Sequence, residues 1–143
     1  MGTHSDLAAI AAVCREHEVV LVVDEAHGAH FGLLPELPRN ALQCGADISV
    51  QSTHKVLGAM TQAAMLHVQG PRVSHKRVSS ALQVLQSSSP SYILMGSLDA
   101  ARLQVDALLC HPTSATQESF LHRGLRCPPS LPLQNDFNQL YCK

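Results

Sequence analysis

Apolar residues near the start of the chain recur with a helical period. Four of them share the i, i+3, i+4, i+7 spacing of one buried helical face: Leu7, Ile10, Ala11 and Cys14. Ser5 stands just before them and is a residue type that caps helix N-termini. We therefore expect a helix over residues 6–17.

Three short segments are expected to form strands. Residues 19–23 form an uninterrupted Val-Val-Leu-Val-Val run that ends at Asp24, which is typical of a strand buried on both faces of a parallel sheet. Residues 47–52 and 63–68 are the second and third segments, and glycines and prolines between the first two predict a loop-rich connection. The expected architecture is α/β with a mixed sheet.

Two further helices are expected after the strands. Residues 73–85 fit one helix, and Ser89 and Pro90 suit the cap and first turn of the next. The apolar stripe of that last helix has helical spacing: Leu94, Leu98, Ala101 and Val105. Four of the eight prolines fall after residue 110 and break any regular period. We expect an α/β unit over residues 1–110 and an irregular, proline-rich tail over residues 111–143.

The composition is that of one modest globular unit, with 143 residues of which 45% are hydrophobic and 15% charged. Ten Lys and Arg against eleven Asp and Glu give a net charge of -1, so the chain lacks the basic excess that grips nucleic acid. No apolar run is long enough to cross a bilayer, and residues 1–6 do not begin a secretion signal. We expect no nucleic-acid partner, no membrane association and a cytoplasmic location.

Cysteine and histidine usage gives no sign of a metal or disulfide framework. The five cysteines form no CxxC pair, which favours free thiols in a reducing compartment. His27 and His30 are close enough in sequence to raise the question of a metal. No Cys, His and carboxylate set occurs at familiar ligand spacing, so the favoured interpretation is hydrogen-bonded loop histidines, and no metal is expected.

Two polar clusters follow the first two predicted strands. One is Asp-Glu-Ala-His-Gly at residues 24–28, and the other is Ser-Thr-His-Lys at residues 52–55. Ligands of open α/β sheets bind at the carboxyl ends of the strands, where loops converge on one crevice. A pyridoxal cofactor needs a lysine to bond its aldehyde and a carboxylate to keep its ring nitrogen protonated. Asp24 and Lys55 are the candidate pair.

Each member of these clusters has a simpler interpretation when taken alone. A carboxylate such as Asp24 often caps a loop or helix, most lysines stay in solvent, and His27 and His54 suit hydrogen-bonded loop positions. Asp-Glu-Ala-His also spells the acidic box of a helicase family. That box acts beside a GxxxxGK[ST] phosphate loop, which this sequence lacks. Only the joint arrangement of the clusters favours cofactor chemistry.

The flanks of both clusters resemble a known family, the fold-type I pyridoxal-phosphate-dependent decarboxylases of ornithine, lysine and arginine. The similar segments keep one order along the chain: residues 2–8, 22–32, 45–47, 51–55, 61–62, 65–68, 85–92 and 97–102. The resemblance covers about residues 2–106, and it is specific because the aspartate and lysine motifs occur together with their flanks. It implies that residues 1–110 are part of an aspartate-aminotransferase-like large domain, with a mostly parallel sheet and flanking helices.

Carried over residue by residue, the resemblance implies a role for each cluster. Lys55 resembles the lysine that forms a Schiff base with pyridoxal 5'-phosphate and later returns a proton to the product. Asp24 resembles the carboxylate on the pyridine nitrogen. Ala26 matches the small residue against the ring, and His27 follows it toward the pocket. Two more positions match residues near the cofactor phosphate and the lysine: Ser52 and His54.

The activity that the resemblance implies is decarboxylation of lysine, ornithine or arginine to its amine and CO2, as in polyamine biosynthesis, by a homodimer or larger homo-oligomer. In this family the phosphate loop and the residue stacked on the ring's other face come from upstream of Gly2. We therefore expect a fragment of a longer enzyme, inactive in isolation, with a plastid location if a transit peptide precedes it. Two alternatives stay open: an inactive segment that acts by association with a full-length partner, and another fold-type I reaction such as aminotransfer.

Overall fold

The computed structural model describes residues 4–34 and 37–110, and the tail predicted for residues 111–143 lies outside them. Within this part of the chain the elements are, in order, α1 (Leu7–Glu16), β1 (Val22–Asp24), β2 (Ile48–Gln51), α2 (Thr53–Val56), β3 (Met65–Val68), α3 (His75–Leu85) and α4 (Tyr92–Cys110). All three predicted strands and the three predicted helices are present. The short helix α2, which carries the candidate lysine, was not predicted.

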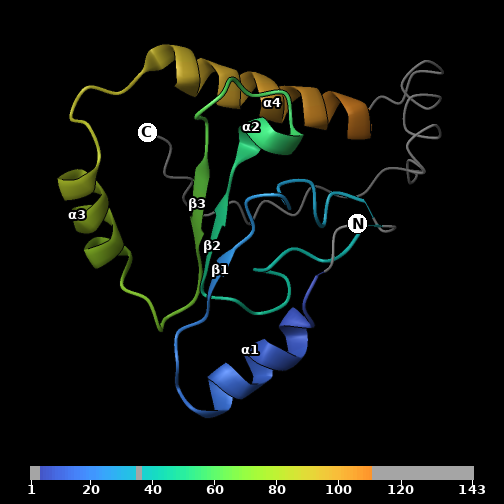
Figure 1. Cartoon of the computed structure of the whole chain (residues 1–143), viewed down its shortest axis with the longest axis vertical. Helices are drawn as coiled ribbons and strands as arrows, with labels where there is room; N and C mark the ends of the chain where they lie inside the picture. Colours follow the sequence, from blue (N-terminus) through green and yellow to red (C-terminus); the bar gives the residue numbers. More distant parts are fainter. Residues whose placement is uncertain (1–3, 35–36, 111–143) are drawn as a thin grey trace.

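The three strands form one sheet in the order β1-β2-β3 (Figure 1). β1 and β2 are parallel, with Asp24 opposite Val50. β2 and β3 are antiparallel, with Ile48 opposite Val68. The mixed sheet is confirmed, but a mostly parallel one is not, since one of the two described pairings is antiparallel. The connection from β2 to β3 contains only the four-residue α2, so the chain returns directly along β2 instead of crossing over to a parallel position.

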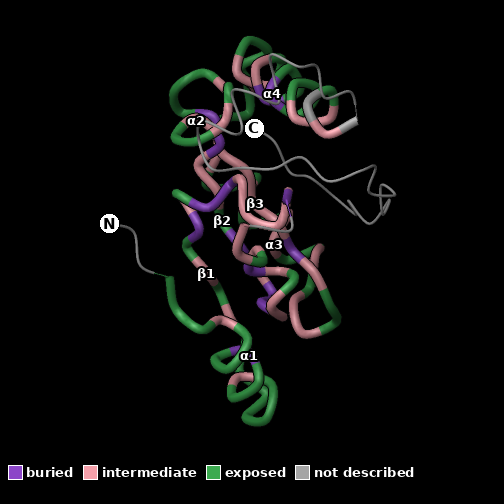
Figure 2. The backbone as a smooth tube through the Cα atoms, turned by 90° about the vertical axis from the view of Figure 1, so that its right-hand side faces the viewer, coloured by how far each residue is buried: buried purple, intermediate pink, exposed green. Residues whose placement is uncertain are grey.

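The longer helices lie mainly around the ends and one side of the sheet. In both views α1 lies beyond one end of the strands and α4 beyond the other, near α2 (Figure 1 and Figure 2). α3 lies on the β3 side (Figure 1). Figure 2 also shows that α1 is largely exposed. The faces of the sheet therefore receive less cover from these helices than a doubly wound fold would give.

β1 is shorter and more exposed than its apolar sequence predicts. Only Val22–Asp24 of the run is a strand, and the Val22 side chain is 58% exposed. The prediction of a strand buried on both faces is wrong for the part of the chain that the structure describes. The physical reason is that the longer described helices lie mainly around the ends and one side of the sheet, so they give the faces of β1 little cover (Figure 1 and Figure 2).

Two helices begin later than their sequences predict. The N-cap of α1 is Asp6 and not Ser5, because the Asp6 carboxylate accepts a hydrogen bond of 3.1 Å from Ala9 N–H and places a negative charge at the positive end of the helix. α4 begins after Ser91 and not at Ser89, and the Ser91 hydroxyl accepts from the N–H of the residue three positions on. The predicted stripe of α4 is confirmed, with two buried and two half-buried members: Leu98 and Ala101, and Leu94 and Val105.

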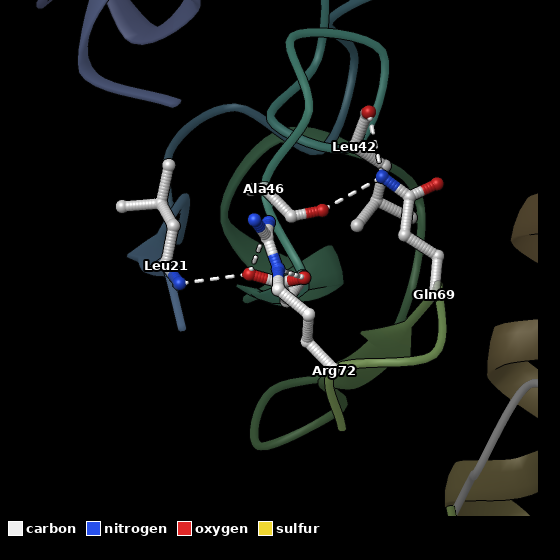
Figure 3. Close-up of polar contacts among 6 residues, drawn as sticks. Leu21, Leu42, Ala46, Gln69 and Arg72 are labelled. Carbon is white, nitrogen blue, oxygen red and sulfur yellow. Dashed lines mark hydrogen bonds and ion pairs between the residues drawn. The ribbon is translucent and has the colours of Figure 1, made fainter. Parts of the chain in front are cut away.

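A buried carboxylate ties the amino end of β2 to both neighbouring strands (Figure 3). Asp47 Oδ2 accepts a hydrogen bond of 2.8 Å from Leu21 N–H, just before β1, and Arg72, after β3, donates to both Asp47 oxygens at 2.8 Å. The Gln69 side chain donates to two carbonyls of the loop before β2, those of Leu42 and Ala46. These contacts hold one end of the sheet together, which leaves the opposite end, at the carboxyl termini of β1 and β2, for a site.

Candidate active site

A cleft of about 850 Å³ lies at the carboxyl end of β1. Its volume falls within the range of small-molecule sites, roughly 300–1,000 Å³. The lining comes from separate parts of the chain: the residues around the start of α1, the turn after β1, residue 38, and α2. The cleft brings together four of the six predicted site residues: Asp24, Ala26, His27 and Lys55.

Asp24 is the last residue of β1 and is exposed at the cleft. Its Oδ1 accepts a hydrogen bond of 3.0 Å from Ala26 N–H, the local turn that an aspartate makes with the backbone two residues on. The backbone thereby fixes the direction of the carboxylate. A carboxylate held in this way can accept a charge-assisted hydrogen bond from a protonated ring nitrogen.

The turn after β1 is closed by backbone hydrogen bonds and packed tightly. Gly28 N–H donates to Glu25 O at 2.8 Å, and Phe31 N–H donates to Gly28 O at 2.8 Å. A Cβ atom on Gly28 would lie 2.5 Å from Glu25 Cγ and 2.8 Å from Phe31 Cδ2, closer than side-chain atoms approach. The turn therefore requires glycine at this position, and it sets Ala26 and His27 into the cleft wall.

Lys55 reaches the same cleft from α2. Ser52 is the N-cap of α2, and its carbonyl accepts a hydrogen bond of 3.0 Å from Lys55 N–H. The Lys55 side chain is exposed and lines the cleft. Because β1 and β2 are parallel, with Asp24 opposite Val50, the carboxyl end of β1 and the start of α2 lie at the same end of the sheet. A primary amine and a carboxylate therefore share one cleft.

Ser52 and His54 flank Lys55 in sequence but are not among the residues that line the cleft. Both are half-buried. His54 Nδ1 lies 2.8 Å from Ala63 O, and the His54 backbone N–H donates to the same carbonyl at 3.2 Å. Because a carbonyl oxygen only accepts, Nδ1 carries the proton of this contact. His54 thus ties α2 to the residue two positions before β3.

The cleft lining also includes a buried carboxylate that the sequence analysis did not single out. Glu25 is 6% exposed. Its Oε1 accepts a hydrogen bond of 2.9 Å from Ala41 N–H, and its Oε2 accepts from Ser49 Oγ at 3.2 Å and from Gln51 Nε2 at 2.7 Å. The signal in the sequence was the alternation of side chains along a strand, which directs Glu25 to the side opposite Asp24.

Two half-buried histidines lie in the electrostatic field of Glu25. Burial lowers the pKa of His67 below its ordinary value and outweighs the nearby Glu25 charge, which acts in the opposite direction. The pKa of His30 is lowered by burial in the same way, again against the charge of Glu25. His67 Nε2 lies 3.0 Å from Gln51 Oε1, so a neutral His67 donates from Nε2 to the amide oxygen. A hydrogen-bonded chain from Glu25 through Gln51 to His67 therefore crosses β2 and β3.

The family model of the Orn/Lys/Arg decarboxylase major domain matches residues 1–118. The chain belongs to this decarboxylase family. The family resemblance is thereby confirmed, and the match extends past residue 106, where the resemblance in the sequence ended. The boundary between an ordered unit and a tail at residue 110 stays a prediction.

Several curated relatives of this Orn/Lys/Arg decarboxylase chain come from Bacillus. The uncharacterized protein YaaO of Bacillus subtilis is 47% identical over 109 residues, which are 76% of this chain and 23% of that protein. An arginine decarboxylase of the same strain is 44% identical over 101 residues, 71% of this chain and 21% of the relative. An arginine decarboxylase of Bacillus anthracis is 42% identical over 141 residues, 99% of this chain and 27% of the relative. The chain thus spans between a fifth and just over a quarter of the length of these relatives.

The residues of the cleft have the chemistry to hold a pyridoxal group. Lys55 offers a primary amine, Asp24 offers a carboxylate held by Ala26 N–H, and the short Ala26 side chain leaves room beside them.

The described residues do not form a metal site. Among residues 4–34 and 37–110, no three His, Cys, Asp or Glu side chains are grouped so that they could hold an ion. In the same described residues, no helix has both the length and the apolar character needed to cross a bilayer.

Proposed function

We propose that this chain supplies the cofactor-lysine segment of a pyridoxal 5'-phosphate-dependent decarboxylase that converts a basic amino acid to its amine and CO2. The observation that carries the proposal is that Asp24 and Lys55, from separate elements, line one cleft of suitable volume. Membership of the Orn/Lys/Arg decarboxylase family supports the reaction class. Arginine is the first substrate to test, because several relatives are named arginine decarboxylases.

The chain's own residues would act at defined atoms. When bound, pyridoxal 5'-phosphate supplies a ring that takes up the electrons of the bond to the departing carboxylate. Lys55 Nζ would hold this group covalently and would later deliver a proton to the carbon that has lost CO2. The Asp24 carboxylate would keep the ring nitrogen protonated through a charge-assisted hydrogen bond, a contact of about 1.5–3 kcal/mol. Ala26 would pack against the ring, and His27 would face it at the cleft wall.

Ser52 and His54 are proposed to act near the phosphate of the cofactor and near Lys55. The position of Ser52 at the N-cap of α2 supports this role, since its side chain makes no capping hydrogen bond. The contact of His54 Nδ1 with Ala63 O supports a second role for this histidine, which is to hold α2 and therefore the backbone of Lys55 in place. Assembly as a homo-oligomer and a cytoplasmic location belong to the same proposal and rest on family membership.

Titration of the purified chain with pyridoxal 5'-phosphate tests the proposal. A visible absorption band of a lysine-bound cofactor is expected for the wild-type chain and for Lys76→Ala, which removes an exposed lysine in α3. Lys55→Ala should abolish the band. If the band is absent from the wild type or survives in Lys55→Ala, the cofactor role of this chain is lost and the alternative of an inactive, associating segment takes its place.

Product analysis on a protein that contains this segment together with the rest of a relative's length separates decarboxylation from aminotransfer. Incubation with arginine, lysine or ornithine should yield the corresponding amine and CO2. A keto acid in place of the amine would instead identify the alternative fold-type I reaction. The isolated chain is expected to bind the cofactor without turnover.

A further inference from the structure

Two backbone hydrogen bonds fix Glu25 at the start of the turn after β1. Its N–H donates a hydrogen bond of 2.9 Å to Val50 O, which continues the β1–β2 ladder one residue past Asp24. Its carbonyl accepts from Gly28 N–H at 2.8 Å and closes the turn. Asp24, the last residue of β1, is therefore followed directly by a residue whose backbone N–H and carbonyl are both hydrogen-bonded.

The Glu25 side chain extends this anchoring to two other segments. Ala41 N–H binds Oε1 from the loop before β2, and Ser49 Oγ and Gln51 Nε2 bind Oε2 from β2 itself. All three partners act as donors, which suits an ionised carboxylate because it has only acceptor atoms. A glutamine at position 25 would turn an NH2 group toward one of these donors, and at least one buried hydrogen bond would be lost.

The turn after β1 is also shaped around the Glu25 side chain. Gly28 has no Cβ atom, and Glu25 Cγ lies 2.5 Å from the position that such an atom would occupy. Gly28, which follows Ala26 and His27 in the turn, therefore packs directly against the Glu25 side chain. Glu25, which directly follows the candidate cofactor aspartate Asp24, is a buried carboxylate and is 6% exposed.

We infer that Glu25 is a positioning residue of the site, which holds Asp24 and the turn after β1 in the geometry that binds the cofactor. This inference rests on the proposed function for its purpose, but its structural content can be measured without any cofactor. Although Glu25 lies at the cleft, protein donors bind both of its carboxylate oxygens, so it would act through Asp24 and Ala26.

Hydrogen exchange of backbone amides separates a positioning role from a merely stabilising one. The matched control is Asp47→Asn, since Asp47 is an equally buried carboxylate, 3% exposed, at the opposite end of the sheet. In Glu25→Gln the amides of Ala26 and Gly28 should exchange roughly tenfold faster than in the wild type, the factor that one lost buried hydrogen bond corresponds to. In Asp47→Asn their exchange, corrected for global stability, should be unchanged.

Equal exchange of these two amides in Glu25→Gln and Asp47→Asn would overturn the inference and leave Glu25 with a general role in stability. Should Glu25→Gln fail to fold, Ser49→Ala, which removes one donor and keeps the carboxylate, gives the same comparison with a smaller expected effect. A second readout is the affinity for pyridoxal 5'-phosphate, which Glu25→Gln should weaken roughly tenfold and Asp47→Asn should leave unchanged. If the wild-type chain gives no cofactor band, the proposed function fails for this chain, and amide exchange still decides the role of Glu25.

Discussion

Arg72 binds both carboxylate oxygens of Asp47: Nε donates a hydrogen bond to Oδ1 and Nη2 donates one to Oδ2, each at 2.8 Å. The pair joins the chain just after β3 to the residue just before β2 (Figure 3). Burial alone would raise the pKa of Asp47, but the hydrogen bonds from Arg72 and from Leu21 N–H outweigh it and lower the pKa from its ordinary value of 3.8. A carboxyl group whose pKa is lowered on folding stabilises the ionised folded state.

Asp47→Asn should lower the melting temperature clearly at neutral pH. The amide keeps an acceptor for only part of the Arg72 and Leu21 donors, and the charge is lost. Because the stabilisation is present above pH 3.8 and is lost as the pH falls through the lower, folded-state pKa, the difference from the wild type should shrink in acid. Thermal denaturation followed by circular dichroism over this range measures it.

Asp99→Asn is the control for this prediction, since Asp99 pairs with Arg102 on the surface of α4 with its side chain 71% exposed. Exposed pairs contribute about 0–1 kcal/mol, so its melting temperature should stay near that of the wild type. A difference between Asp47→Asn and the wild type that is equally large at pH 7 and well below pH 3.8 would contradict the assignment.

His67 should make the chain less stable in mild acid. Burial lowers its pKa below 6.5, against the charge of Glu25, so the unfolded chain binds a proton more readily than the folded one. Its contribution to stability is complete above pH 6.5 and is lost as the pH falls toward the folded-state pKa. His67→Gln keeps a side-chain donor for Gln51 but cannot titrate, so urea unfolding at a series of pH values should show a flatter pH dependence. An unchanged slope would exclude His67 as its source.

Gly28→Ala should destabilise the turn after β1, because the added Cβ would meet Glu25 Cγ at 2.5 Å and Phe31 Cδ2 at 2.8 Å. Overpacking of this kind costs about 1–3 kcal/mol. Gly96→Ala in α4 is the matched substitution, since its Cβ would meet nothing within 4 Å, and it should stabilise the helix by up to about 1 kcal/mol. Denaturant unfolding of the two variants should therefore give free-energy changes of opposite sign, and changes of the same sign would contradict the tight packing of the turn.

Leu98 is a buried residue of α4 and is 3% exposed. Leu98→Ala should cost about 2–5 kcal/mol of unfolding free energy, as for other buried leucines. Leu103, on the same helix, is 59% exposed, and Leu103→Ala should change the free energy by no more than about 0.5 kcal/mol. Similar losses for both variants would mean that α4 packs through a different face.

The sequence predicts the elements and the shared cleft because these depend on local patterns. The strand runs ended in polar clusters, and parallel pairing of β1 with β2 brought Asp24 and Lys55 to one cleft. Burial of β1 was not predictable in this way. The Val22 side chain has the composition of a buried residue but is 58% exposed, because burial depends on which elements lie over a strand and not on the strand itself.

The helix caps and the buried Glu25 show a second limit of prediction from the sequence. Ser5 and Asp6 are both good caps, and only the backbone geometry at the start of α1 selects Asp6. Glu25 adjoins the candidate aspartate, yet its partners Ala41 and Gln51 lie 16 and 26 positions away in sequence. Contacts of that range arise from the sheet and the loop before β2, so no local pattern reveals them.

Identification of the lysine that carries the cofactor would decide whether Lys55 and Asp24 form one cofactor site. The purified chain is incubated with pyridoxal 5'-phosphate, the adduct is reduced with borohydride, and the modified peptide is located by mass spectrometry. Asp24→Asn is included as a variant that keeps the lysine but removes the carboxylate charge from the same cleft. We expect modification at Lys55 and not at Lys76, and less labelling of Lys55 in Asp24→Asn than in the wild type. Equal labelling of Lys55 and Lys76, or labelling of Lys55 that is unaffected by Asp24→Asn, would contradict it.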